Sequence, residues 1–342
     1  MQQEASLAEA MDTVEHRLGV VVPVYFPQGV DHSLGRRLLE DNVSSYLRYL
    51  TRPETLCLSV DGAEYGREIA DDLATRLGVR VCVAPHNKGK LQAVRAGMAA
   101  LYEETGLDYL AAVDADGDHF ANEVVNLVRG ARWVQQKSGA EVMVLGQRRS
   151  RHHPMGLLRG ELEELADRVL LDALAYDAVG RGQPLALEWG TTLAEFPDFH
   201  SGFKLFSRSL VPPTFTQTPH LSEAGEDAYF KHGVEAVMTV ESLLAGGRLV
   251  LVNRSTYNEQ PISTFGLLNR TRMVADKIIW PCKRLGVPGP FVDQWLRNHI
   301  PRLLLGTLAP QGQEELAQIH RLVLEAYAME AGPELTLGPL FV

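Results

Sequence analysis

The deciding stretch of the sequence is Leu110-Ala-Ala-Val-Asp114-Ala-Asp116-Gly-Asp118-His119, where an apolar run ends in three aspartates at alternate positions. Residues 108–113 have the length and composition of a buried strand, and apolar residues at helical spacing follow over 124–134. Carboxylates at the carboxyl end of a strand face the ligand in an open α/β sheet. Packed so closely, they repel one another unless a cation neutralises them, and oxygen ligands suit Mg²⁺ or Mn²⁺. The stretch therefore predicts a buried strand that ends in a metal or phosphate site.

On both sides of this stretch, apolar runs of strand length alternate with segments of helical periodicity. Such alternation is typical of a mostly parallel, Rossmann-like central sheet flanked by helices, so the predicted fold class is α/β. The predicted strands span residues 19–25, 55–60, 79–83, 108–113 and 141–145, and the helices between them include 34–50 and 91–102.

The pattern changes in the second half of the chain. A basic cluster beginning at Arg148 precedes a long amphipathic helix, and a loop over 180–197 leads to an alternating strand over 199–206. One more strand, 249–252, comes before helical segments that prolines interrupt. We predict three regions: an N-terminal extension over 1–16, a ligand-binding domain over 17–245 and a mainly helical C-terminal region over 246–342.

The composition excludes several classes of protein. The 342 residues include 33 Lys and Arg against 43 Asp and Glu, and the net charge of −10 disfavours nucleic acid as a partner. No apolar run approaches the ~18 residues of a membrane span, and the start of the chain lacks a signal-peptide pattern. Cys57, Cys82 and Cys282 are widely spaced, which favours reduced thiols over disulfides or a zinc site. We therefore expect a soluble cytoplasmic protein.

Six short segments follow one another along the chain. They are Val20-Val-Val-Pro-Val-Tyr25, Val60-Asp61-Gly62, Asn87-Lys-Gly-Lys-Leu-Gln-Ala-Val-Arg-Ala-Gly97, Asp114-Ala-Asp116, Ser201-Gly-Phe-Lys-Leu-Phe-Ser207 and Glu226-Asp227. In this order, over residues 19–243, they resemble the family 2 glycosyltransferases of the GT-A fold. The segments 114–119 and 201–205 are locally similar to dolichyl-phosphate mannose synthases.

The resemblance implies a GT-A domain with a helical C-terminal extension. It also implies a metal-dependent enzyme that moves a hexose, mannose or glucose, from a nucleoside diphosphate sugar to a hydroxyl acceptor. Departures from the family pattern after Tyr25 and after Asp61 leave the base open, so the donor is GDP- or UDP-linked. Because the sequence shows no membrane helix, we expect a small soluble acceptor such as a polar acid or a sugar.

The metal site implied by this chemistry lies in the acidic stretch. A divalent cation, Mg²⁺ or Mn²⁺, would neutralise the leaving diphosphate as a Lewis acid. Asp116 is the principal predicted ligand, with Asp114 and Asp118 beside it. His200 is the best histidine to complete the set because it directly precedes the Ser-Gly-Phe segment, whereas scattered histidines are more often structural.

Further matched positions are expected to contact the nucleotide. Asp61 corresponds to the family position that contacts the base or ribose, and Pro23 and Tyr25 would form a wall of the nucleotide site. Lys88 and Lys90 lie at the start of a helix, where their charge and the helix end both favour phosphate.

The acceptor side is predicted from two other segments. Asp227 matches the acidic residue that removes the acceptor proton in inverting members of the family, with Glu226 as the alternative, so inversion is favoured over retention. Arg148, Arg149 and Arg151 would hold an anionic acceptor or the diphosphate.

The acidic stretch also permits other interpretations. A calcium loop is excluded, because the sixth and twelfth positions counted from Asp114 are His119 and Val125 instead of Gly and Glu. A haloacid-dehalogenase-like sugar phosphatase and a non-catalytic nucleotide-sugar-binding protein stay open as alternatives. The C-terminal region either covers the acceptor site, with residues 258–264 as a loop over it, or pairs subunits in a homo-oligomer.

Overall fold

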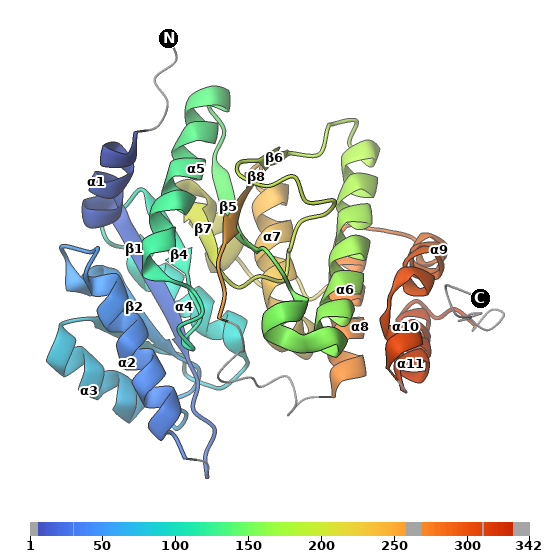
Figure 1. The fold of residues 1–342 in the computed structure, drawn as a ribbon, viewed down its shortest axis with the longest axis horizontal. Helices are drawn as coiled ribbons and strands as arrows, with labels where there is room; N and C mark the ends of the chain where they lie inside the picture. Colours follow the sequence, from blue (N-terminus) through green and yellow to red (C-terminus); the bar gives the residue numbers. More distant parts are fainter. Residues whose placement is uncertain (1–5, 30, 258–268, 310, 331–342) are drawn as a thin grey trace.

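A twisted eight-stranded sheet forms the centre of the molecule, and helices cover both of its faces (Figure 1). The structure is a computed structural model that describes residues 6–29, 31–257, 269–309 and 311–330. The strand order is β3-β2-β1-β4-β7-β5-β8-β6. The strands are β1 (Leu18–Val24), β2 (Leu56–Val60), β3 (Arg80–Val83), β4 (Tyr109–Ala112), β5 (Val142–Arg148), β6 (Leu187–Trp189), β7 (Lys204–Ser207) and β8 (Arg248–Arg254).

Side chains that point alternately to the two faces of the sheet divide the core into two layers. In β1, Val20 and Val22 pack on one side and Val21 on the other, because successive side chains of a strand point to opposite faces. The helices α1 (Leu7–Arg17), α2 (Ser33–Leu47), α3 (Arg67–Leu77) and α5 (Val124–Ser138) cover the first face. The second face carries α4 (Lys90–Tyr102), α6 (His152–Gly180), α7 (Val234–Leu244) and α8 (Arg270–Arg284).

The register of the strands collects the polar loops at one edge of the sheet. β1 runs parallel to both β2 and β4, so the loops after Val24, Val60 and Ala112 leave from the same edge. β7 is antiparallel to β4, with Ala112 paired to Lys204, so the residues that precede β7 arrive at this edge too. A single antiparallel strand thus brings residues 198–203 beside the acidic loop 113–119.

The predicted α/β fold with a mostly parallel sheet is confirmed, and three segments differ in detail. The predicted loop over 180–197 contains β6, a short edge strand that pairs with β8. The predicted strand over 199–206 is regular only from Lys204, because a turn closed by the bond from the Ser201 amide to the Asp198 carbonyl precedes it. β8, which begins after residue 245, lies between β5 and β6, so the sheet extends to Arg254.

Helices at both ends of the chain pack onto this core. α1 contacts α5, and α8 lies against α6 and α11. The remaining helices, α9 (Gly289–His299), α10 (Leu305–Leu308) and α11 (Gly312–Ala326), lie beside α6 and α8 (Figure 1). None of the described helices is both long enough and apolar enough to cross a membrane. The loop predicted over residues 258–264 lies outside the described residues.

Candidate active site

A cavity of ≈ 90 Å³ with polar walls opens at the carboxyl edge of the sheet, between the acidic loop and α6. One wall carries Lys90 and the three loop aspartates. The rest of the lining includes Arg148 and His200, together with side chains from α6, α7 and α8. The structure therefore lines one cavity with Lys90, Asp114, Asp116, Asp118, Arg148 and His200, six of the residues predicted from sequence.

Lys90 connects two carboxylates at the start of α4. Its Nζ lies 2.7 Å from Asp114 Oδ1 and 2.8 Å from Glu235 Oε1. Burial would raise the pKa of Asp114, but the charge and hydrogen bond of Lys90, together with other nearby positive charges, outweigh burial and hold that pKa well below its usual range. Burial likewise opposes ionisation of Glu235, yet Lys90 and Lys277 lower its pKa to about 2. Both carboxylates are therefore charged at neutral pH, and Lys90 is fixed between them.

The acidic loop is held by α2 and by His119. Asn42 Nδ2 donates to the Asp114 carbonyl (2.8 Å), and the Tyr46 hydroxyl donates to the His119 carbonyl (2.9 Å). The Asp114 amide donates to His119 Nδ1 (2.9 Å), so the neutral ring carries its proton on Nε2, which faces Asp114 Oδ2 at 3.8 Å. Burial keeps the pKa of His119 well below its ordinary value. The ring stacks on Phe203 with 4.9 Å between centroids, and this packing fixes the loop.

The three loop aspartates have different partners. Arg254 Nη1 lies 3.0 Å from Asp118 Oδ2, and the Tyr257 amide donates to Asp118 Oδ1 (2.8 Å), so both carboxylate oxygens of Asp118 are engaged. Asp116 Oδ1 accepts from the Asp118 amide (3.1 Å). Each of the three loop aspartates thus contacts other groups of the protein.

The donor set of this loop fits a hard divalent cation, since it offers carboxylate oxygens. The wall opposite Asp114 is shaped by Gly202, where an added Cβ would lie only 2.6 Å from Asp114 Oδ2. No three ligand atoms from His200 and the loop aspartates lie within 4.8 Å of one another. In the described part of the chain, the group whose ligand atoms lie that close together is His152, Glu161 and Glu164 on α6. A metal in the acidic loop is therefore a proposal that rests on donor chemistry.

Of the residues predicted to contact the base and phosphates, Lys90 lines the cavity, and Asp61, Pro23, Tyr25 and Lys88 do not. Asp61 is buried and accepts from the Lys88 amide (3.1 Å) and the Gly89 amide (2.9 Å). Burial raises the pKa of Asp61, and these two bonds oppose that rise. Tyr25 is exposed and stacks on Tyr65, with 5.2 Å between centroids. Asp61 thus braces the turn from which α4 begins.

This turn requires glycine at position 89. Its φ is +121°, a region that disfavours side chains, and an added Cβ would lie 2.5 Å from the carbonyl oxygen of Phe230.

Pro23 lies in the last part of β1, beside Ser59 of β2 in the register. Lys88 is partly exposed and pairs with Glu226 at 3.0 Å.

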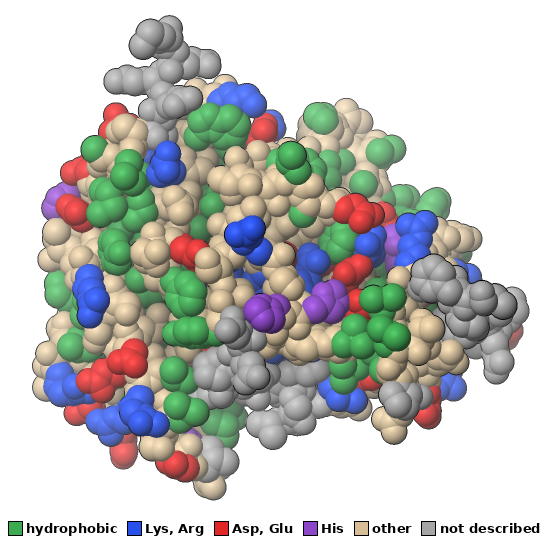
Figure 2. Space-filling view, in the orientation of Figure 1, with side chains coloured by type: hydrophobic (Ala, Val, Ile, Leu, Met, Phe, Trp, Pro, Cys, Tyr) green, Lys and Arg blue, Asp and Glu red, His purple; other side chains and the backbone are tan. Residues whose placement is uncertain are grey.

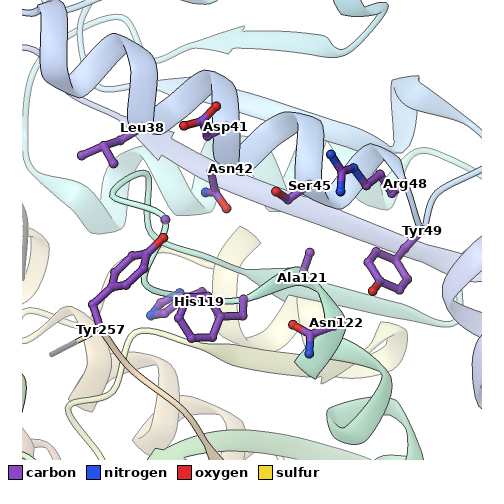
Figure 3. A pocket seen from close by; sticks show the side chains of 12 residues that line it. Leu38, Asp41, Asn42, Ser45, Arg48, Tyr49, His119, Ala121, Asn122 and Tyr257 are labelled. Atoms are coloured by element: carbon purple, nitrogen blue, oxygen red, sulfur yellow. The ribbon is translucent and has the colours of Figure 1, made fainter.

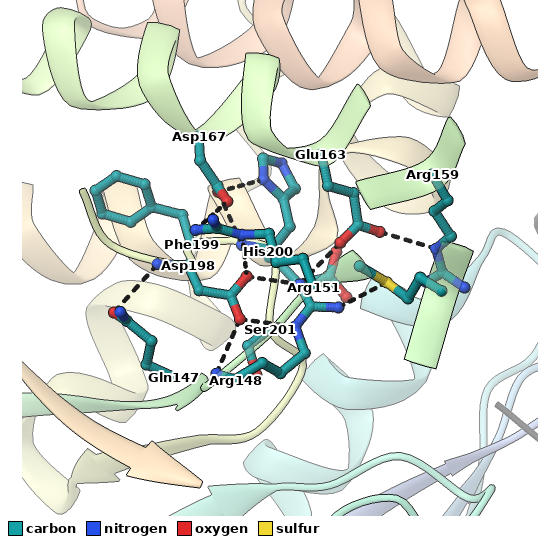
Figure 4. Close-up of polar contacts among 12 residues, drawn as sticks. Gln147, Arg148, Arg151, Arg159, Glu163, Asp167, Asp198, Phe199, His200 and Ser201 are labelled. Carbon is teal, nitrogen blue, oxygen red and sulfur yellow. Dashed lines mark hydrogen bonds and ion pairs between the residues drawn. The ribbon is translucent and has the colours of Figure 1, made fainter. Parts of the chain in front are cut away.

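Arg148 belongs to a buried network of ion pairs (Figure 4). Its guanidinium donates to Asp198 through Nε (2.7 Å) and Nη2 (2.6 Å), and to Glu163 (2.8 Å). Arg151 lies 3.3 Å from Asp198 and 3.1 Å from Asp167. The pKa of Glu163 is held below its usual range: burial would raise it, but the charges of Arg148, Lys277 and Arg159 together outweigh burial. Arg148 and Arg151 are thus occupied by buried carboxylates, and Arg149 is exposed.

The predicted catalytic pair lies on the surface. The Asp227 side chain is 64% exposed and pairs with Lys231 at 2.7 Å, four residues along the chain. The Glu226 side chain is also exposed, and neither residue lines the cavity. The π-helical turn η5 (Ala228–His232) directly follows them, and α7 comes after it. Nothing in this geometry favours Asp227 as the base.

Besides His119 and Gly202, which lie within the matched segments, sequence reasoning missed five charged residues that line the cavity: Arg159, Glu163, Glu235, Arg254 and Lys277. A signal was present for two of them. Arg159, Glu163 and Asp167 recur every four residues, which places a charged stripe along one side of α6. Glu235, Arg254 and Lys277 come from distant segments, and no local pattern marks them.

A second cavity of ≈ 310 Å³ borders the same loop, between α2 and η2 (Ala121–Glu123) (Figure 3). Asp41 and Ser45 line it from α2, and Asn122 and Tyr257 from the other side. None of the residues predicted for the site lines this cavity. On the outside of the molecule, charged side chains of both signs are interspersed (Figure 2).

Comparison with known proteins identifies the class of fold. No protein-family model matches the chain, and no curated protein matches it in sequence. The structure is similar to glucosyl-3-phosphoglycerate synthase from Mycobacterium tuberculosis, solved in complex with Mn²⁺, UDP-glucose and phosphoglyceric acid. The TM-score is 0.51 at 19% identity, over 81% of this chain and 84% of that one. A mannosyltransferase from Pyrobaculum calidifontis, solved with GDP-mannose and Mn²⁺, has a TM-score of 0.48 at 14% identity, over 93% of this chain and 77% of that one. The likeness to the first shows that the fold is GT-A, as predicted.

Proposed function

We propose that the protein is a metal-dependent glycosyltransferase that moves a hexose from a nucleoside diphosphate sugar to a hydroxyl acceptor. The observation that carries this proposal is the placement of Asp114, Asp116 and Lys90 together at the carboxyl edge of a GT-A sheet. Ligands bind at that edge in open α/β folds. The neighbour solved with Mn²⁺ and UDP-glucose supports the same class of donor.

Each residue of the loop has a part in this chemistry. Asp116 and Asp114 would hold Mg²⁺ or Mn²⁺, and the bound ion would supply Lewis-acid neutralisation of the departing diphosphate. Lys90 adds a positive charge beside Asp114, and Asn42 and Tyr46 keep the loop backbone in place. The protein thus provides the electrostatic stabilisation that an anionic leaving group needs before the reaction begins.

The finer assignments belong to this proposal too. Mannose or glucose as the sugar and a small polar acid or sugar as the acceptor follow from the resemblance to family 2 enzymes. The neighbour's complex with phosphoglyceric acid supports a small acidic acceptor. The likeness to dolichyl-phosphate mannose synthases, location in the cytoplasm and pairing of subunits through residues 246–342 stay predictions.

A thermal-shift screen tests the proposal. Nucleoside diphosphates and their hexose derivatives are added with and without Mn²⁺, because a ligand that binds the native state raises its stability, by about 2.7 kcal/mol at 100 times Kd. We expect one base to stabilise the protein only when Mn²⁺ is present, and Asp116→Asn to remove the effect. Asp108→Asn is the matched control, since Asp108 lies at the opposite end of β4 and pairs with Arg17. Stabilisation without metal, or by no nucleotide at all, would contradict the proposal.

A further inference from the structure

One buried group in the cavity has no part in the chemistry above. His200 lines the cavity and its side chain is fully buried, yet its Nε2 has no hydrogen-bond partner among the described residues. A buried polar atom without a partner is uncommon in a folded protein and calls for an explanation. A substrate atom that occupies the cavity would supply the missing partner.

The other ring nitrogen is fixed by Asp167. His200 Nδ1 lies 2.7 Å from Asp167 Oδ1, and the same oxygen accepts from the His200 amide at 3.2 Å (Figure 4). A carboxylate only accepts hydrogen bonds, so Nδ1 carries the proton and the neutral ring presents a lone pair at Nε2. Arg151, 3.1 Å from Asp167 Oδ2, anchors the carboxylate from its other side. His200 is thereby oriented as a hydrogen-bond acceptor toward the cavity.

The surroundings distinguish His200 from the carboxylates as a base. The charged groups that face this part of the cavity are Asp167, Glu163 and Arg159 on α6, Arg148 on β5, Glu235 on α7 and Lys277 on α8. The two glutamates that line the cavity form ion pairs with basic side chains: Glu235 with Lys90, and Glu163 with Arg148 and Arg159. A carboxylate in such a pair is a weaker base than a free one, whereas the lone pair of His200 Nε2 is engaged by none of the described residues.

We propose that His200, oriented by Asp167, is the general base that activates the acceptor hydroxyl. This inference rests on the proposed glycosyltransferase function and replaces Asp227 in that role. The acceptor O–H bond breaks and its proton passes to Nε2. The oxygen lone pair forms the bond to the anomeric carbon of the sugar, while the bond from that carbon to the diphosphate breaks and its electron pair leaves with the nucleoside diphosphate. A single displacement of this kind inverts the anomeric centre.

Two substitutions separate the role of base from other roles. In His200→Asn the amide can still donate to Asp167 and nothing stands at the Nε2 position. In His200→Gln the amide reaches the Nε2 position and can hydrogen bond the acceptor without taking its proton. We expect kcat to fall by about 10²–10⁴-fold in both variants with little change in the acceptor KM.

His320→Asn is the matched control, because His320 forms another His–Asp pair, 2.6 Å from Asp293, and does not line the cavity. Its kcat should equal that of the wild type. Rescue of kcat by His200→Gln would make His200 a binding group only. Loss of Mn²⁺-dependent stabilisation by nucleotide in both His200 variants would make it a metal ligand.

Either of these two results, or a product that NMR shows to retain the donor's anomeric configuration, would overturn the inference and leave the transferase function standing. Absence of transfer by the wild type with every donor and acceptor would overturn the proposed function itself. The two failures are therefore distinguishable.

Discussion

The buried ion-pair network around Arg148 lets us predict how much unfolding free energy is lost when one of its carboxylates is removed. Asp198 has no exposed surface, accepts three hydrogen bonds from Arg148 and lies 3.3 Å from Arg151. Asp198→Ala leaves Arg148 with Glu163 alone, and breaking a buried ion pair costs about 3–5 kcal/mol. Because Arg148 keeps one carboxylate, we expect a loss at the lower end, about 3 kcal/mol.

Urea unfolding at neutral pH, followed by circular dichroism, measures this loss. Burial would raise the pKa of Asp198, but Arg148 and Arg151 outweigh burial and lower it. The stabilisation is therefore complete above the unfolded pKa of ~3.9 and is lost only as the pH falls below it.

Two variants serve as controls for that measurement. Asp198→Asn keeps the volume and tests the charge by itself. Asp227→Ala removes an exposed ion pair, which contributes about 0–1 kcal/mol. If Asp198→Ala cost no more than Asp227→Ala, the network would not stabilise the fold as we describe.

Three further predictions concern the acidic loop and β7. Asp116→Asn should lower transfer by about 100-fold or more in a donor-consumption assay, since a Lewis acid contributes several kcal/mol, and should leave the circular dichroism spectrum unchanged. Gly202→Ala would press on Asp114 and should weaken Mn²⁺-dependent nucleotide stabilisation in a thermal-shift assay, whereas Gly180→Ala, with nothing within 4 Å, should not. Burial lowers the pKa of Lys204 from 10.5 to about 8, so the unfolded chain binds more protons between these values. The free energy of unfolding should therefore rise with pH over that interval, and Lys204→Met should remove the rise in a urea titration.

The parallel half of the sheet could be predicted because its signals are local. Each strand of this half is an apolar run of ordinary length, and each loop follows its strand directly in the sequence. Parallel strands end at one edge, so Asp61, Lys90 and Asp114 could be expected near one another from chain order alone.

In the second half of the site, Arg148 and His200 are among the predicted residues, whereas the positions of the other side chains depend on tertiary contacts that the sequence does not show. β7 reverses direction, and only the pairing of Ala112 with Lys204 places His200 beside the acidic loop. The partner of Asp118 is Arg254, 136 residues further along the chain, and no spacing rule links them. Asp227 matched a family position, but its side chain points to solvent and pairs with Lys231.

The central claim is metal-dependent transfer of a hexose at the edge where Asp114 and Asp116 lie. The most direct measurement incubates the protein with UDP-glucose or GDP-mannose, a mixture of small hydroxy acids and sugars, and Mn²⁺, and detects hexose-bearing products by mass spectrometry. We predict a product that forms with Mn²⁺ and is lost on chelation of the metal or in Asp116→Asn. A product that forms equally well without metal and in Asp116→Asn would contradict the claim.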